Sequence, residues 1–240
     1  MSSFLSVDHS LTGRRWVGPT PETDRLAEAM AQTTRLPLPL ARILVARGVS
    51  PQDAEGFLEP TLRDLLPDPR SLKDMERAAT RFLAALNTGE KIAVFADYDV
   101  DGGSSAALLI HWLRSMGRQA TLYIPDRIDE GYGPNEPAME ALARDHSLII
   151  CVDCGTLSHG PVAAAKPADV IILDHHLGGE TLPEALACVN PNRLDETGDL
   201  GHLCAASVVF LMLVEANRQL RAQDVQGPPL MALLDLVALA

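Results

Sequence analysis

The sequence predicts an α/β fold, a parallel sheet flanked by helices, with a helical extension at the N-terminal end. Four short apolar runs carry this prediction: IAVFA (92–96), TLYI (121–124), LIICV (148–152) and VIIL (170–173). Runs that stay apolar without alternation are typical of strands covered on both faces. These runs are separated by stretches of helix length, and strands that alternate with helices form parallel sheets.

Composition limits the class of protein before any motif is considered. The chain has 240 residues, of which 47% are apolar and 22% charged. That is enough for one large domain, or one domain with an extension, and it excludes a disordered or collagen-like chain. No apolar run approaches the roughly 18 residues of a membrane span, and the first ten residues lack a secretory signal pattern. Four cysteines without such a signal indicate reduced thiols, so we expect a soluble, cytoplasmic protein without a membrane partner.

Residues 1–90 are predicted to form the helical N-terminal extension. The first 35 residues are polar and weakly periodic, which is typical of an irregular arm with one short helix. Residues 36–48 have a helical pattern that ends in glycine. Ser50-Pro51 has the residue types of a helix start, and a further helix is expected over about 72–86.

Residues 91–240 are predicted to form the α/β domain. Between the first two strands, residues 104–117 place their large apolar side chains in one stripe at helical spacing, before a glycine stop. The last ten residues, MALLDLVALA, end apolar without a cap or polar tail. We therefore expect this domain to be truncated at its C-terminal end.

Acidic residues follow three of the four predicted strands. Asp97, Asp99 and Asp101 come after the first strand, Asp153 follows the third, and Asp174-His175-His176 follows the fourth. Because the carboxyl ends of parallel strands meet at one edge of a sheet, we expect these side chains to converge there. A single aspartate after a strand is most often a helix cap. Three strand ends of this kind favour a cation site instead, because clustered carboxylates repel unless a cation neutralises them.

This set of side chains predicts a particular chemistry. Carboxylate oxygens with an imidazole nitrogen suit Mn²⁺, and Mg²⁺ is also compatible. Two such ions about 3.5–4 Å apart can polarise a phosphoryl group and activate water, which predicts metal-assisted phosphodiester hydrolysis. Gly102 and Gly103, at a helix start, would let backbone N–H groups approach a phosphate. The sequence contains no P-loop, dinucleotide-binding fingerprint or serine-hydrolase elbow.

Three segments resemble a known family. ADYDVDGGSS (96–105), VDCG (152–155) and LDHH (173–176) are similar, in this order, to the first three motifs of the DHH phosphoesterase family. Further segments resemble the RecJ branch of that family, which comprises single-strand-specific DNA exonucleases: RILVARGV (42–49), FLEPTLRDLLPDP (57–69), YIPDRIDEGYGPN (123–135) and LLDLVALA (233–240).

The resemblance implies a function and its cofactors. A RecJ-like enzyme removes nucleotides from the 5′ end of single-stranded DNA in recombination and DNA repair, using Mn²⁺ or Mg²⁺, with two ions expected. Single-stranded DNA is the implied partner, together with a single-strand-binding protein and a helicase.

The resemblance also implies roles for individual residues. The metal ligands it implies are Asp99, Asp101, Asp153 and His175. Asp97 and Asp174 match supporting acids of the catalytic site, and His176 matches a residue that contacts the scissile phosphate. The implied substrate-binding residues are Gly102, Gly103, Ser104, Arg127, Tyr132 and His159; of these, Arg127 could bind a phosphate and Tyr132 could stack on a base.

Two alternatives stay open at this point. In the family, the segment resembling 233–240 continues to a further metal-ligating aspartate, a second core domain and an OB-fold, whereas this sequence ends at Ala240. The isolated chain is therefore expected to be weakly active, or an inactive fragment that binds metal and nucleic acid. The other alternative is a DHH phosphodiesterase that acts on short oligonucleotides or cyclic dinucleotides.

Overall fold

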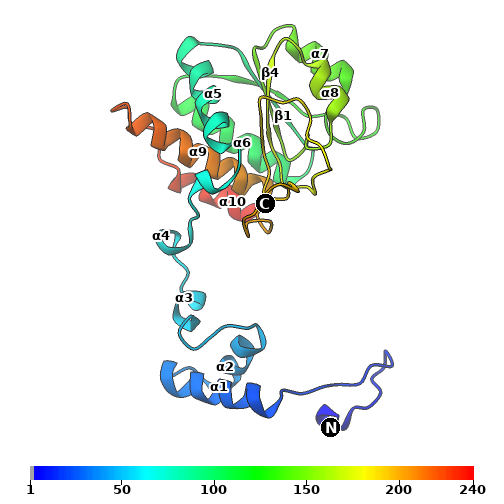
Figure 1. Ribbon diagram of the computed structural model, residues 1–240, viewed down its shortest axis with the longest axis vertical. Coiled ribbons are helices and arrows are strands. Elements are labelled where there is room, and N and C mark those ends of the chain that lie inside the picture. Colours follow the sequence, from blue (N-terminus) through cyan, green and yellow to red (C-terminus); the bar gives the residue numbers. More distant parts are fainter. Residues whose placement is uncertain (1–2) are drawn as a thin grey trace. The chain divides into compact units, whose positions relative to one another are not determined.

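The computed structural model describes residues 3–240 and contains two compact units, Met1–Pro67 and Asp68–Ala240 (Figure 1). Among the described residues, no helix combines the length and the apolarity that crossing a membrane requires.

The first unit is helical, as predicted. The short turn η1 (Phe4–Ser6) comes before α1 (Pro21–Thr34), α2 (Leu38–Ala46), α3 (Ala54–Leu58) and α4 (Leu62–Leu65). Its core consists of five small or flexible side chains: Ala27, Met30, Ala41, Leu44 and Ala54.

The expectation of one short helix in the first 35 residues was wrong, because α1 has 14 residues. Thr20 starts this helix by accepting a hydrogen bond from the backbone N–H of Thr23, and a proline follows at the first helical position. Only Ala27 and Met30 of α1 are buried, so its apolar periodicity is weak and hard to read from sequence.

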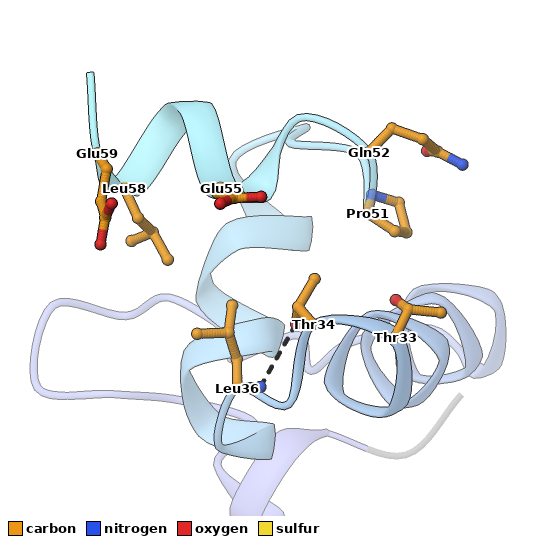
Figure 2. Close-up of a pocket in the computed structure, with 8 residues that line it drawn as sticks. All are labelled: Thr33, Thr34, Leu36, Pro51, Gln52, Glu55, Leu58 and Glu59. Carbon is orange, nitrogen blue, oxygen red and sulfur yellow. Dashed lines mark hydrogen bonds between the residues drawn. The ribbon is translucent and has the colours of Figure 1, made fainter. Parts of the chain in front are cut away.

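The first unit also contains an open pocket of about 470 Å³ beside the end of α1 and the helix α3 (Figure 2). Its charged groups are the carboxylates of Glu55 and Glu59, both exposed. The remaining lining residues are Thr33, Thr34, Leu36, Pro51, Gln52 and Leu58.

The second unit is built on the predicted parallel sheet, which is confirmed. The strands are β1 (Ile92–Ala96), β2 (Ala120–Tyr123), β3 (Leu148–Val152), β4 (Asp169–Leu173) and β5 (Ala187–Val189). They are all parallel and lie in the order β2-β1-β3-β4-β5. The fifth strand was not predicted, because three residues are too few to distinguish a strand from a loop by pattern.

Helices cover both faces of this sheet (Figure 1). One face is covered by four helices: α5 (Met75–Thr88), α6 (Val100–Ser115), α9 (Ala205–Arg221) and α10 (Leu234–Leu239). These helices share a core with alternate strand residues such as Val94 and Ile150. On the other face, α7 (Glu136–Ala143) and α8 (His159–Ala164) pack with the intervening residues, such as Phe95 and Cys151. Two short 3₁₀ turns, η2 (Pro69–Ser71) and η3 (Met231–Leu233), complete the unit.

The strand order sets the position of a ligand-binding crevice. From β1 the chain moves to β2 on one side of the sheet and then to β3 on the other. In open parallel sheets, ligands bind beyond the carboxyl ends of the strands where the order reverses in this way. Here that point lies between the ends of β1 and β3, which the aspartate motifs follow.

The boundary between the two units differs from the expected one at residue 90. It falls after Pro67, because α5 belongs to the sheet-containing unit. Phe82 and Leu83 of α5 are buried in the same core as the strands, and Phe82 lies against Trp112 of α6 with ring centroids 5.1 Å apart. Exposing these side chains would cost several kcal/mol of apolar burial, so the helix packs with the sheet.

Arg193 ties the end of β5 to the start of α5. Its Nη1 donates to the carbonyl of Cys188 at 2.6 Å and to Asp74 Oδ2 at 2.9 Å. Its Nε and Nη2 donate to both oxygens of Asp195, each at 2.9 Å. The guanidinium thus satisfies two carboxylates and a carbonyl, and it fixes the loop after β5.

Replacing this arginine should destabilise the second unit. In Arg193→Ala, the Cys188 carbonyl loses this charged donor, and the Asp74 carboxylate loses one partner while it keeps the Cys188 N–H and Arg77. We therefore expect the free energy of unfolding to fall by roughly 2–3 kcal/mol. Urea unfolding followed by circular dichroism measures this change. Lys166→Ala removes an exposed ion pair to Glu184 and should stay within about 0.5 kcal/mol of the wild type. Equal stability of both variants would contradict this role of Arg193.

Candidate metal centre

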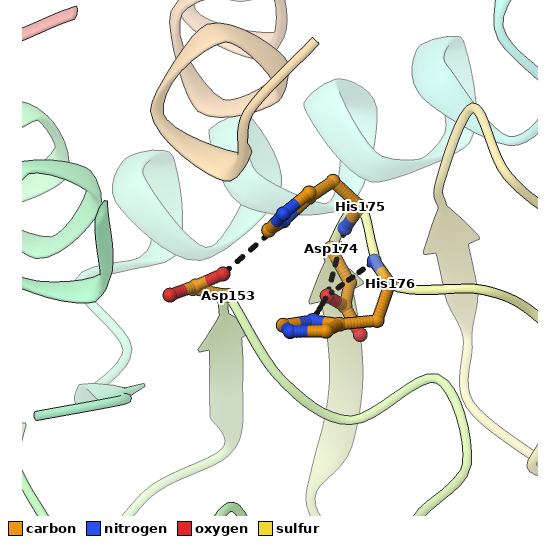
Figure 3. Close-up of side chains that lie close together, drawn as sticks. All are labelled: Asp153, Asp174, His175 and His176. Carbon is orange, nitrogen blue, oxygen red and sulfur yellow. Dashed lines mark hydrogen bonds and ion pairs between the residues drawn. The ribbon is translucent and has the colours of Figure 1, made fainter. Parts of the chain in front are cut away.

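The ends of β1, β3 and β4 bring two overlapping groups of ligand atoms together. In each group, one ligand atom per residue lies within 4.8 Å of the others. One group contains Asp97, Asp99 and Asp153, and the other contains Asp153 and the sequence Asp174-His175-His176 (Figure 3). Asp153 is common to both, so the predicted convergence of the strand ends takes place around this carboxylate.

The backbone after β3 is shaped to hold Asp153 in this position. Asp153 has a φ of 59°, in the left-handed region that aspartate tolerates better than most residues. Gly155 follows with a φ of 114°, and a Cβ there would press on Cys151 and Ile172 at 3.3 Å. This tight turn keeps the Asp153 side chain at the edge of the sheet.

The loop after β1 uses one of its aspartates as a helix cap. Asp99 Oδ1 accepts hydrogen bonds from the backbone N–H groups of Asp101 and Gly102, at 2.9 and 3.0 Å. The helix α6 therefore begins at Val100, four residues before the predicted start, and Asp101 lies in its first turn. A cap and a cation ligand are compatible roles for Asp99, because both capping hydrogen bonds go to Oδ1 and neither uses Oδ2.

Asp101 lies at the edge of the cluster, and its carboxylate accepts hydrogen bonds from another helix. Its two oxygens accept hydrogen bonds from the backbone N–H groups of Ala205 and Ala206, at 2.8 and 2.7 Å, where α9 begins. Its Oδ2 lies 3.7 Å from Nδ1 of His175. Asp101 belongs to neither of the two ligand groups and in this structure anchors the N-terminus of α9.

The buried side-chain atoms without hydrogen-bond partners are of types that bind a cation. Among the described residues, four buried side-chain atoms have no hydrogen-bond partner, and three of them are Asp97 Oδ1, Asp153 Oδ1 and His175 Nδ1. Asp153 Oδ1 and His175 Nδ1 face each other at 3.2 Å (Figure 3). Buried polar atoms are almost always paired in native proteins. Carboxylate oxygens and an imidazole nitrogen are ligands of Mn²⁺, so these residues fit a divalent cation.

The electrostatics of the carboxylates agree with that interpretation. Burial raises the pKa of Asp153 to about 8, and the negative charges of Asp101 and Asp99 contribute to the same shift. Burial also raises the pKa of Asp97, again with help from Asp99, although the backbone N–H of Tyr98 opposes it. A bound cation would favour the ionised form of both groups.

Asp174, in contrast to Asp153, has a lowered pKa, and both oxygens of its buried carboxylate accept hydrogen bonds. Its Oδ1 accepts from the backbone N–H of His175 at 2.7 Å and from Nδ1 of His176 at 2.8 Å. Its Oδ2 accepts from the N–H and the hydroxyl of Thr156, at 3.0 and 2.7 Å. Burial alone raises the pKa of Asp174, but the hydrogen bonds from His176 and Thr156 outweigh it and hold the pKa at about 2.

An exposed row of rings leads away from the cluster at His176. The hydroxyl of Tyr132 lies 3.1 Å from His176 Nε2 and donates to the carbonyl of Asp153 at 3.2 Å. The ring of Tyr98 meets that of Tyr132 edge-on at 6.4 Å, and the guanidinium of Arg127 lies 5.2 Å above Tyr98. A cation, two phenol rings and an imidazole thus form one row of neighbouring groups beside the carboxylates.

The other predicted substrate-binding residues differ in their exposure and packing. Gly103 is exposed, and a Cβ there would meet nothing within 4 Å, but its N–H donates to the carbonyl of Asp99 at 2.9 Å. Gly102 is buried, and a Cβ there would collide with the backbone carbonyl of Asp97, so close packing of the loop explains this glycine. Ser104 is buried in α6, and His159 is the exposed first residue of α8, outside both ligand groups.

Sequence reasoning missed the residues that hold the histidine loop. Asn190 is fully buried, and its Nδ2 donates to the hydroxyl of Thr156 and to the carbonyl of His176, both at 2.8 Å. Asn192 Nδ2 donates to the carbonyl of His175 at 2.5 Å. The available signal was the short apolar run Ala187–Val189 followed by Asn-Pro-Asn, which is a strand end with polar residues like the other three.

The raised pKa of Asp153 predicts a pH dependence of the protein without metal. The unfolded chain ionises this group near 3.8 and the folded chain near 8. Protonation of Asp153 therefore adds to the free energy of unfolding. This contribution is fully present below about pH 4 and is lost as the pH rises through 8. In EDTA, the melting temperature of the wild type should therefore fall relative to Asp153→Asn between pH 5 and 8. Parallel melting curves of the two proteins over this range would contradict the shift.

Comparisons with known proteins agree with the geometry. The sequence profile described as DHH family, N-terminal domain, matches residues 91–240. The single-stranded-DNA-specific exonuclease RecJ of Bacillus subtilis is 38% identical over 200 residues, 82% of this chain and 25% of that protein. RecJ of Escherichia coli is 37% identical over 229 residues, 91% of this chain and 38% of that protein.

A solved structure gives the same relationship. The crystal structure of RecJ from Thermus thermophilus in complex with Mn²⁺ matches with a TM-score of 0.68 and 26% identity, over 92% of this chain and 30% of that chain. The chain thus spans less than two fifths of the length of these relatives. The matched profile covers more than half of the chain and all of the sheet and its strand-end motifs, and the chain therefore belongs to the DHH family.

Proposed function

We propose that this chain provides the metal-binding part of a nuclease that hydrolyses single-stranded DNA, the substrate that the name of the RecJ relatives gives. Digestion from the 5′ end is proposed from the resemblance to the RecJ branch. The observation that carries the proposal is the set of unpartnered buried atoms of Asp97, Asp153 and His175. They lie beside the row formed by His176, Tyr132, Tyr98 and Arg127. Action in the cytoplasm, and cooperation with a single-strand-binding protein and a helicase, follow from the resemblance to RecJ.

The proposed cofactors are two divalent ions, Mn²⁺ or Mg²⁺. Asp97, Asp99 and Asp153 would hold one, and Asp153 with His175 would hold the other, so that Asp153 is shared. Asp101 would contribute a remaining lone pair near His175, beyond the two that it gives to α9. When bound, such ions polarise a phosphoryl oxygen and lower the pKa of water. RecJ from Thermus thermophilus was crystallised with Mn²⁺, which supports this choice.

His176 is proposed to stabilise the charge that develops on the phosphate. Its hydrogen bond to Asp174 raises its pKa, which favours the protonated ring. The single proton of the Tyr132 hydroxyl is donated to the Asp153 carbonyl, so this hydroxyl can accept a proton from His176 Nε2. A protonated imidazole held in this way can transfer that hydrogen bond to a phosphate oxygen as negative charge builds up.

The row of rings and the Arg127 guanidinium are proposed to hold the DNA strand. Tyr132 and Tyr98 present ring faces and edges on which bases can stack without sequence preference. Arg127, placed over Tyr98, can pair with a backbone phosphate. The N–H groups of Gly102 and Gly103 both donate to Asp99, so they do not supply a further phosphate contact. The rings and the guanidinium suit a flexible single strand, because its bases are unpaired and can stack on protein side chains instead of on one another.

Removing the shared carboxylate should remove metal binding. We expect Asp153→Asn to weaken Mn²⁺ binding at least tenfold in titration calorimetry, because a charged ligand common to both groups becomes a neutral amide. The matched control is Asp145→Asn, which changes an exposed aspartate outside both ligand groups and should bind Mn²⁺ like the wild type. Unchanged affinity of Asp153→Asn would show that the cluster does not bind the ion.

Digestion of labelled substrates tests the activity itself. With Mn²⁺, single-stranded DNA labelled at its 3′ end should shorten progressively from the 5′ end. His176→Gln should lower kcat by about 10²–10³-fold, the effect of losing one donor to a developing charge, while leaving Mn²⁺ affinity unchanged. Cleavage of a dinucleotide or a cyclic dinucleotide but not of DNA would favour a short-substrate phosphodiesterase. Mn²⁺ binding with no cleavage of any substrate would show a binding fragment.

A further inference from the structure

A buried polar chain lies behind His176 and runs from the end of β5 to the imidazole. It consists of Asn190, Thr156 and Asp174, each no more than 1% exposed. Asn190 Nδ2 lies 2.8 Å from Thr156 Oγ1, Thr156 Oγ1 lies 2.7 Å from Asp174 Oδ2, and Asp174 Oδ1 lies 2.8 Å from His176 Nδ1. Figure 3 shows the last link, in which the Asp174 carboxylate reaches the His176 ring.

The direction of each hydrogen bond in this chain is determined by its neighbours. The backbone N–H of Asn192 can only donate, and it lies 2.7 Å from Asn190 Oδ1, so the other atom of that amide is the NH₂ group. Its two protons go to Thr156 Oγ1 and to the carbonyl of His176. Because Thr156 Oγ1 accepts from Asn190, its own proton is directed to Asp174 Oδ2.

Asp174 therefore has no capacity left for a cation. Its Oδ2 accepts twice from Thr156, and its Oδ1 accepts from the ring of His176 and from two backbone N–H groups. An ionised carboxylate offers about four lone-pair positions, and all are used. Although Asp174 lies within ligand distance of Asp153 and His175, its contacts orient the histidine loop instead.

We propose that Thr156 and Asn190 are positioning residues, which act through Asp174 to hold the His176 imidazole in its reactive orientation. Asn190 holds the loop twice, once through Thr156 and once through the His176 carbonyl. The Thr156 hydroxyl then fixes the plane of the Asp174 carboxylate, and with it the direction of His176 Nε2. This inference rests on the proposed function of His176, since it assigns the groups that support that residue.

The test compares two substitutions of Thr156 that differ in the hydroxyl. Thr156→Val keeps the shape of the side chain and removes the donor, whereas Thr156→Ser keeps the donor and removes a methyl group. We expect Thr156→Val to lower kcat on 3′-labelled single-stranded DNA by about 10–100-fold, a typical effect of losing an outer hydrogen-bond partner. The KM for DNA and the Mn²⁺ affinity should not change, and Thr156→Ser should recover most of the activity. Thr197→Val, at an exposed threonine, is the matched control.

A second readout does not depend on activity. The sample is metal-free protein labelled with ¹⁵N-histidine, and the imidazole signals of His176 are identified by their loss in His176→Gln. These NMR signals should shift in Thr156→Val and stay in place in Thr156→Ser. If the wild type digests no DNA, the proposed function fails, but this spectrum still decides whether the chain positions His176. Unshifted signals in Thr156→Val, or equal loss of kcat in the Val and Ser variants, would overturn the inference.

The wild type supplies a measurement in case Thr156→Val does not fold. Both side-chain amide protons of Asn190 are buried and bonded, so they should exchange with solvent far more slowly than those of Asn135, which is only partly buried. Exchange of the Asn190 protons as fast as those of Asn135 would show that the chain is not formed and would overturn the inference.

Discussion

The crowding of carboxylates around Asp153 is the constraint on which the rest of this structure depends. Three aspartates at the ends of β1 and β3, Asp97, Asp99 and Asp153, place ligand atoms within 4.8 Å of one another, and burial raises the pKa of Asp153 and Asp97. Such an arrangement is unfavourable without a compensating positive charge. A fold can keep it only if many other contacts hold the strand ends in place, which the two apolar faces of the sheet do here.

The carboxylates of the site divide into two kinds. Asp101 and Asp174 accept hydrogen bonds from the protein on both oxygens, one on each oxygen of Asp101 from the N-terminus of α9, and several on Asp174 from Thr156 and the histidine loop. Asp97 and Asp153 keep an oxygen without a partner. The first kind gives the site its shape, and the second is left to bind. Proximity alone does not reveal this division, because members of both kinds lie at similar distances from His175.

Membership of the DHH family and the local geometry support the same chemistry by independent routes. The family match extends over residues 91–240, which hold the whole sheet. The contacts within this chain leave the buried atoms of Asp97 and Asp153 unpartnered. They also keep Asp174 ionised and place Tyr132 and Tyr98 beside the carboxylates. The relatives are longer by more than a factor of two, and the contacts described here concern the candidate metal centre.

The sequence by itself determined the sheet and the convergence of the strand-end motifs, because uniformly apolar runs and aspartates at their ends are local patterns. Two of its strands, at 92–96 and 148–152, have the predicted bounds. Only the tertiary structure decided that α5 belongs to the sheet, that Asp101 anchors α9, and that β5 brings Asn190 behind His176. Each of these depends on contacts between residues about 100 positions apart, or between segments too short to show a period, and no local pattern encodes them.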